Sequence, residues 1–153
     1  MSTIAASDRR AWLFPLSYAV HIGDECASGR GFTSWLAHTV GVQLTLAEFL
    51  WLNAVALVLM TLGVLLATRQ REHGWVIPCL SVVVVVNALL HIAGSAAFRS
   101  LSPGTVSAAM LWLPLGCWML WRAARTLSQR MLVGGAIGGL FISLLVCLLT
   151  LAI

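Results

Sequence analysis

The chain has 153 residues, of which 60% are hydrophobic and only 9% are charged. A typical soluble domain carries about 25% charged residues, so this composition excludes a soluble fold and indicates an integral membrane protein. The net charge of +4 arises from nine arginines, since the chain contains no lysine. The arginines stand singly or in pairs at the ends of apolar runs, which excludes the clustered basic face of a nucleic-acid-binding protein.

The apolar runs predict an all-α bundle of five membrane-spanning helices in a single transmembrane domain. A span needs about 20 apolar residues, and a chain of this length has room for roughly five of them. The shorter segment 31–41 is too polar to span, but its apolar residues recur at helical spacing, so it is either a helix on the membrane surface or a plain connector. Pro114 predicts a kink in the fourth span. The five predicted spans are 11–27, 44–68, 75–98, 105–121 and 131–153.

The distribution of arginine predicts the orientation of these spans. With five spans, seven arginines fall on the side of the N-terminus and two on the opposite side. Cytoplasmic loops carry the excess of basic residues, so the N-terminus is predicted to be cytoplasmic, in a plasma membrane. The seven are Arg9, Arg10, Arg69, Arg71, Arg122, Arg125 and Arg130, and the two are Arg30 and Arg99.

Six polar side chains interrupt the first three spans: His21, Asp24, Glu25, Glu48, Asn87 and His91. A charge at the bilayer centre costs about 2.5–3.5 kcal/mol on insertion scales, so such residues are functional by default. His21 and Glu25 are four residues apart, as are Asn87 and His91, and each pair therefore shares a helix face. At about 1.5 Å of rise per residue, both pairs and Glu48 lie in the outer half of the membrane. The spacing predicts one polar pocket between the first three spans.

Acid–base chemistry needs the least from these residues. A carboxyl group in apolar surroundings resists ionisation, which suits a general acid or base, and a neighbouring histidine titrates near neutrality. We therefore expect Glu25 or Glu48 to act as the acid or base, His21 or His91 to be its partner, and Asn87 to be an orienting hydrogen-bond donor. A pocket within the bilayer admits a lipophilic small molecule. The expected function is an enzyme that isomerises, cyclises or hydrates such a molecule.

Three alternatives remain open at this stage. No cofactor is assigned, but His21, Glu25, Glu48 and His91 would supply nitrogen and oxygen ligands that suit a divalent metal such as zinc, iron or manganese. A proton or ion pathway uses similar residues, although the internal repeats of many transporters are lacking. A purely structural polar core is the third alternative, yet interhelical polar pairs contribute only about 0.6 kcal/mol on average.

The last predicted span contains overlapping G-x-x-x-G pairs. Small residues at this spacing allow the backbone of another helix to approach closely. Packing within the bundle is the preferred interpretation, and a homo-oligomeric contact is the alternative. The glycines concerned are Gly134, Gly135, Gly138 and Gly139.

Residues 21–25, His-Ile-Gly-Asp-Glu, resemble the motif of the HXXEE family of small membrane proteins, named for its His-x-x-Glu-Glu sequence. Asp24 stands where the first glutamate is expected, so its carboxylate is one methylene shorter. Asn87-x-x-x-His91 and the turn Ser102-Pro-Gly-Thr105 also resemble the family, over roughly residues 11–125. The resemblance implies a helical membrane bundle but no particular reaction. The emopamil-binding sterol isomerases similarly place His-x-x-x-Glu in a membrane cavity, which is a likeness of site only.

Overall fold

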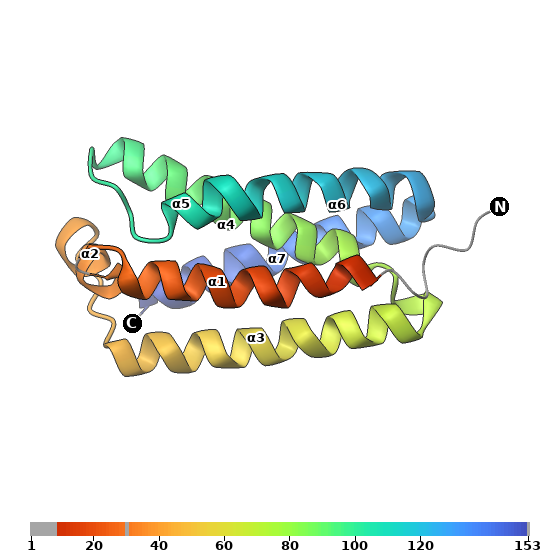
Figure 1. Cartoon of the computed structure of the whole chain (residues 1–153), viewed down its shortest axis with the longest axis horizontal. Helices are drawn as coiled ribbons and strands as arrows, with labels where there is room; N and C mark the ends of the chain where they lie inside the picture. The colour runs from red at the N-terminus through yellow and green to blue at the C-terminus, as the bar shows by residue number, and fades with distance from the viewer. Residues whose placement is uncertain (1–8, 30, 153) are drawn as a thin grey trace.

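The computed structural model describes residues 9–29 and 31–152, and the described residues form helices and loops without a strand. The long helices lie side by side in a bundle, with α1 between α3 and α6 in the view of Figure 1 and with α4 and α7 behind them. Their bounds are Leu13–Ala27 for α1, Leu46–Arg69 for α3, Val76–Ala97 for α4, Leu113–Thr126 for α6 and Gln129–Ala152 for α7. Arg30 and Ile153, which entered the predicted topology, lie outside the described residues.

Three helical stretches are long and apolar enough to cross a membrane, which supports the membrane assignment. They are α3, the segment Arg71–Ala97 that contains the 3-10 turn η2 (Arg71–His73) and α4, and Gln129–Thr150 of α7. Large apolar side chains are exposed along α3 and α7. A helix that presents apolar residues all round is typical of a membrane span, because lipid rather than water covers its outer face.

The helix that contains Pro114 changes its winding instead of ending. It begins with α5 (Thr105–Ser107), widens into the π-helical turn η3 (Ala108–Trp112), and continues without a break into α6. The Leu113 N–H donates to the carbonyl of Ala108, five residues earlier. Proline has no N–H for an ordinary helical bond, and single π-turns are frequent at functional sites. The irregularity predicted at Pro114 is therefore a π-turn directly before it, and the helix extends to Thr126 rather than 121.

Helix α4 is the centre of the bundle and packs most extensively against α7 and α6. Two glycines bring α7 close to it: a Cβ added at Gly135 would lie 2.3 Å from the carbonyl oxygen of Trp75, and one at Gly139 would lie 2.5 Å from that of Cys79. A Cβ added at Gly134 would meet open space. The small residues of α7 thus serve an interface inside the bundle, as small-residue stripes do between membrane helices.

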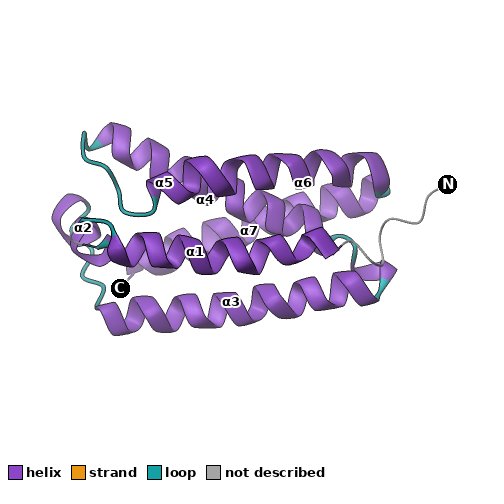
Figure 2. Ribbon diagram, viewed as in Figure 1, coloured by secondary structure: helices purple, strands orange, loops and turns teal. Residues whose placement is uncertain are grey.

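Two connecting segments close one end of the bundle. Helix α2 (Phe32–Thr39) occupies the predicted segment 31–41 and lies beyond the ends of α1 and α3 (Figure 1). The loop that joins α4 to α5 folds back toward α1, as Figure 2 shows. The α1–α3 pair is fastened nearby, because the Tyr18 hydroxyl donates to the Asn53 side-chain oxygen over 2.7 Å. These segments position the candidate site.

Candidate functional site

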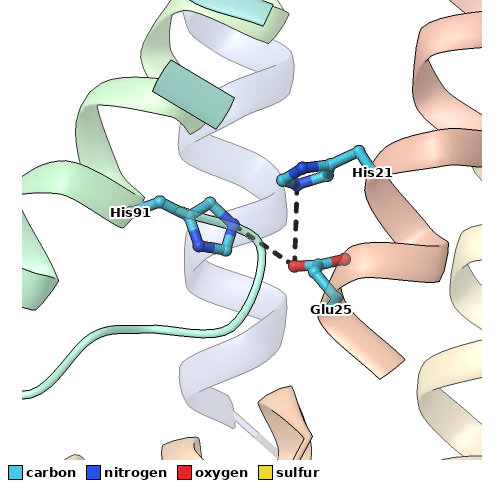
Figure 3. A group of neighbouring side chains, drawn as sticks. All are labelled: His21, Glu25 and His91. Atoms are coloured by element: carbon cyan, nitrogen blue, oxygen red, sulfur yellow. Dashed lines mark ion pairs between the residues drawn. The ribbon is translucent and has the colours of Figure 1, made fainter. Parts of the chain in front are cut away.

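His21, Glu25 and His91 form a buried triad between α1 and α4 (Figure 3). Nε2 of His91 lies 3.2 Å from Oε1 of Glu25, and Nε2 of His21 lies 3.7 Å from the same oxygen. The three residues are only 2%, 5% and 6% exposed, in chain order. Two imidazole nitrogens therefore converge on one carboxylate oxygen in a space that is closed to solvent.

Helical spacing explains why these side chains meet. The buried face of α1 contains Ser17, His21 and Glu25, so four-residue spacing continues the inward stripe. On α4 the buried residues Ala88 and His91 are three apart and face the same interior. The triad thus results from two ordinary buried helix faces that carry polar residues at the same level.

The Ser107 hydroxyl forms a hydrogen bond with the ring nitrogen of His21 that does not face Glu25. Oγ of Ser107 lies 2.8 Å from Nδ1 of His21 and donates to Oδ2 of Asp24 over 2.7 Å. The Ser107 N–H donates to the same carboxylate oxygen over 2.9 Å. A hydroxyl has one proton, so with that proton on the bond to Asp24 the serine oxygen accepts from Nδ1–H of His21. This tautomer leaves a lone pair on Nε2, the nitrogen that faces Glu25.

His91 has a matching support. Its Nδ1 lies 3.2 Å from Oγ of Ser102, whose hydroxyl donates to the Pro103 carbonyl over 3.3 Å. By the same reasoning Nδ1 of His91 carries the proton and Nε2 carries the lone pair. In these tautomers both histidines present unprotonated nitrogens to Glu25, and a proton or a cation between them would stabilise the cluster.

The backbone of Gly104 lies directly against the triad. A Cβ added there would come within 2.6 Å of Cγ of Glu25 and 3.0 Å of Cε1 of both His21 and His91. The residue has φ +87°, a left-handed conformation that glycine adopts without strain. The Ser-Pro-Gly-Thr turn is thus one wall of the site.

Aromatic rings form the other walls. The ring of Trp112, from the π-turn, stacks on His21 with centroids 3.9 Å apart, and Phe32 of α2 lies 5.4 Å from the His91 ring. The two imidazoles meet edge to face at 5.0 Å. These contacts exclude water from the triad and hold its rings in place.

Three other predicted site residues lie around or away from the triad. Asp24 points to Ser107 and so supports His21 without joining the triad. Asn87 is half-buried and close enough to His21 for an electrostatic interaction, and its Oδ1 has no hydrogen-bond partner among the described residues. Glu48 is exposed at the first turn of α3, where it accepts hydrogen bonds from the N–H and hydroxyl of Thr45. The prediction that Glu48 lies in the polar pocket is therefore wrong.

The capping role of Glu48 makes a testable prediction. Thr45 and Glu48 form a complete capping box, in which each side chain satisfies a backbone N–H of the other. Glu48→Ala is expected to lower the midpoint of thermal unfolding, whereas Glu48→Gln is expected to leave it unchanged, because glutamine also serves this position. Thermal unfolding in detergent measures both. Equal losses in the two variants would show that the charge, and not the cap, is what matters.

A cavity of about 770 Å³ lies next to the triad, between α2 and the loop that leads to α5. Ser102 and Gly104 line this cavity and also contact the triad, so their turn has the triad on one side and the cavity on the other. The lining combines hydroxyl and amide groups with apolar surfaces such as Trp35 and Leu101. His38 is the ionisable residue among the described lining residues.

Sequence reasoning missed several residues that build the site. Ser107 and Trp112 lie far from the motif in sequence, and nothing in their own spacing marked them as functional. Ser102 and Gly104 belonged to a turn that the resemblance had singled out, and that turn was the available signal. Only the packing of the α5 segment against α1 brings these residues to His21.

One protein-family profile covers the residues that form this site. A profile described as "Protein of unknown function with HXXEE motif" matches residues 12–119, which include α1, α4, the turn and the π-turn. The chain belongs to the HXXEE family. No significant match was found among curated proteins or among solved structures.

In this chain's HXXEE motif, the first and last residues have different neighbours from the fourth residue, Asp24. His21 and Glu25, the first and last motif residues, point into the triad, while Asp24 bonds to Ser107. The shorter carboxylate at the fourth position, Asp24, still reaches its partner, because the Ser107 hydroxyl and N–H lie 2.7 and 2.9 Å from its Oδ2. The motif of this HXXEE protein therefore supplies two triad members and one supporting acid.

Proposed function

We propose that this HXXEE protein is a membrane-embedded enzyme that carries out acid–base chemistry on a lipophilic small molecule, in the class of isomerisation, cyclisation or hydration. The observation that carries the proposal is the convergence of Nε2 of His21 and Nε2 of His91 on one oxygen of buried Glu25. Two imidazole nitrogens within 3.7 Å of a carboxylate oxygen, shielded from water, are suited to moving a proton to or from a bound molecule.

The proposal includes a five-span topology with a cytoplasmic N-terminus. Helix α1 and the continuous helix from Thr105 to Thr126 lie alongside the three apolar spans in Figure 1. Cation–π contacts between arginines and tryptophans gather at one end of the bundle, including Arg125 over Trp121 with a 3.9 Å separation. Tryptophans are typical of a membrane–water interface, and an excess of arginines is typical of its cytoplasmic side, which supports this orientation in a plasma membrane.

The cavity supports the choice of substrate class. Its volume suits a small lipid-like molecule, and ligand pockets commonly have about 300–1,000 Å³. Leu101, Val106 and Trp35 would contact the apolar part, while Ser34 and Gln43 would bond an uncharged polar end such as a hydroxyl or carbonyl. Movement of the turn at Gly104 would join the cavity to the triad.

The decisive experiment compares lipid extracts from three strains. The native gene is deleted and replaced by the wild type, by Glu25→Gln or by His73→Ala, which removes a histidine of η2 that belongs neither to the triad nor to the cavity lining. Mass spectrometry with chromatographic separation is expected to reveal a compound whose isomer, or whose product with one added water, accumulates only with the wild type and His73→Ala.

The Glu25→Gln variant keeps the shape of the side chain and removes its ionisable proton site. We expect at least a hundredfold loss of product, the lower range for a lost general acid or base. Identical extracts from the wild-type and Glu25→Gln strains, with equal amounts of folded protein, would contradict the proposal. Proton leakage into liposomes that depends on Glu25 would instead favour the ion pathway.

A further inference from the structure

We propose that the triad is a binding site for one divalent transition-metal ion, held by Nε2 of His21, Nε2 of His91 and the carboxylate of Glu25. One ligand atom from each residue lies within 4.8 Å of the others, and all three residues are buried. Zinc bonds of about 2.0–2.1 Å in a tetrahedron place ligand atoms roughly 3.3 Å apart. The two Nε2–Oε1 distances of 3.2 and 3.7 Å bracket that value.

The hydrogen bonds behind the rings prepare both histidines for this role. Metal-bound histidines almost always donate their second ring N–H to a neighbouring acceptor, which sets the tautomer and the ring orientation. Here Nδ1 of His21 bonds to Ser107 and Nδ1 of His91 bonds to Ser102. Ser107 in turn donates to Asp24, so His21, Ser107 and a carboxylate form a hydrogen-bonded chain.

The electrostatics of the triad also favour a bound cation. Nε2 of His21 is buried without a hydrogen-bond partner, and Nε2 of His91 faces a carboxylate oxygen at 3.2 Å. In these tautomers the lone pairs on the two Nε2 atoms are directed at one anionic oxygen and repel it, most strongly in a medium of low dielectric constant. A divalent ion converts this repulsion into three bonds.

The donor set indicates which ion binds. Two imidazoles and one carboxylate, without a thiolate, are the ligands of catalytic zinc sites and of non-haem iron sites, which keep further positions open. The exposed Cys26 is not part of the cluster. We therefore expect zinc, iron(II) or cobalt(II) to bind in preference to magnesium or calcium, which select oxygen ligands.

This inference deepens the proposed function, on which it rests for the reaction though not for the binding itself. An ion at the triad would hold a water molecule or a substrate oxygen at an open position. Metal coordination lowers the pKa of water toward 7, so the bound water can release a proton and take one back. The group that exchanges protons with the substrate would then be this water, and the three side chains would be its supports.

Metal content of the purified protein tests the proposal. The wild type in detergent is stripped with a chelator, incubated with Zn²⁺, freed of loose metal and measured by elemental mass spectrometry. We expect about one zinc per chain for the wild type and for the matched control His73→Ala. His21→Ala, His91→Ala and Glu25→Gln are expected to retain less than a tenth as much, and Co²⁺ in the wild type is expected to give the absorption bands of a low-coordinate site.

Ser107→Ala separates ligation from folding. This variant keeps all three ligands but removes the support of Nδ1, so zinc affinity is expected to fall by about 10–100-fold. A wild-type protein that takes up no zinc would overturn the inference, and so would zinc retained at full stoichiometry in every triad variant. The first of these outcomes is measured on the wild type, so misfolding of a variant does not affect it.

The lipid-extract experiment distinguishes the inference from the proposed function. Zinc at the triad without any lipid product would leave the metal site standing and remove the enzyme. Product formation by stripped protein in the presence of chelator would remove the metal from the mechanism and leave the enzyme standing.

Discussion

Replacing Gly104 by alanine is expected to lower the free energy of unfolding by about 3 kcal/mol and to abolish zinc binding and product formation. A Cβ at this position would lie 2.6 Å from Cγ of Glu25 and 3.0 Å from a carbon of each imidazole, so the triad cannot keep its geometry. The left-handed backbone, at φ +87°, adds about 1–2 kcal/mol for a non-glycine residue, and overpacking adds about 1–3 kcal/mol. Thermal unfolding in detergent and zinc content measure the two effects.

Gly41→Ala is the matched control for this prediction. Gly41 has φ +82°, almost the same φ as Gly104, but nothing lies within 4 Å of the Cβ that the substitution adds. The control therefore includes the backbone strain and leaves out the contact with the triad. Equal stability losses in the two variants, with zinc still bound by Gly104→Ala, would contradict the placement of the turn against the triad.

Replacing Gly139 by alanine is expected to separate α7 from α4 and to cost about 1–3 kcal/mol. The added Cβ would lie 2.5 Å from the carbonyl oxygen of Cys79 and 2.8 Å from Cβ of Val82, and neither atom is the flexible end of a side chain. The midpoint of thermal unfolding in detergent measures the loss. Zinc content is expected to change less than stability, since the triad lies between α1 and α4 rather than at this interface.

Gly134→Ala is the control on the same helix. Its added Cβ meets open space, and alanine has the higher helix propensity, so stability is expected to stay equal or to rise by up to about 1 kcal/mol. A large loss at Gly134 together with tolerance at Gly139 would reverse the assignment. The face of α7 that holds Gly134 would then be an oligomeric contact.

The sequence was most informative where a local rule applied. Apolar runs of about 20 residues indicated membrane helices, and three of them are long and apolar enough to span. Four-residue spacing placed His21 and Glu25 on one face, and the depth estimate placed His91 at a similar level, and these three residues meet in the structure.

The same reasoning failed for Glu48, for a reason that is also local. Depth in the membrane placed it near the triad, but a glutamate three residues after Thr45 is a capping residue, and its side chain bonds back to the helix start. The signature Thr-x-x-Glu was present in the sequence, so capping chemistry would have been a better guide than depth.

Composition and spacing alone indicate a helical membrane protein and predict the histidine–glutamate pair, because hydrophobic burial and the helix period act within a single segment. Which groups support that pair depends on segments more than 80 residues apart in the chain. Only the packing of the α5 segment and its glycine turn against α1 brings Ser107 and Gly104 to His21, and with them the tautomer and the closed shape of the site. No local pattern encodes such contacts, since they arise when separate helices bury their inward faces together.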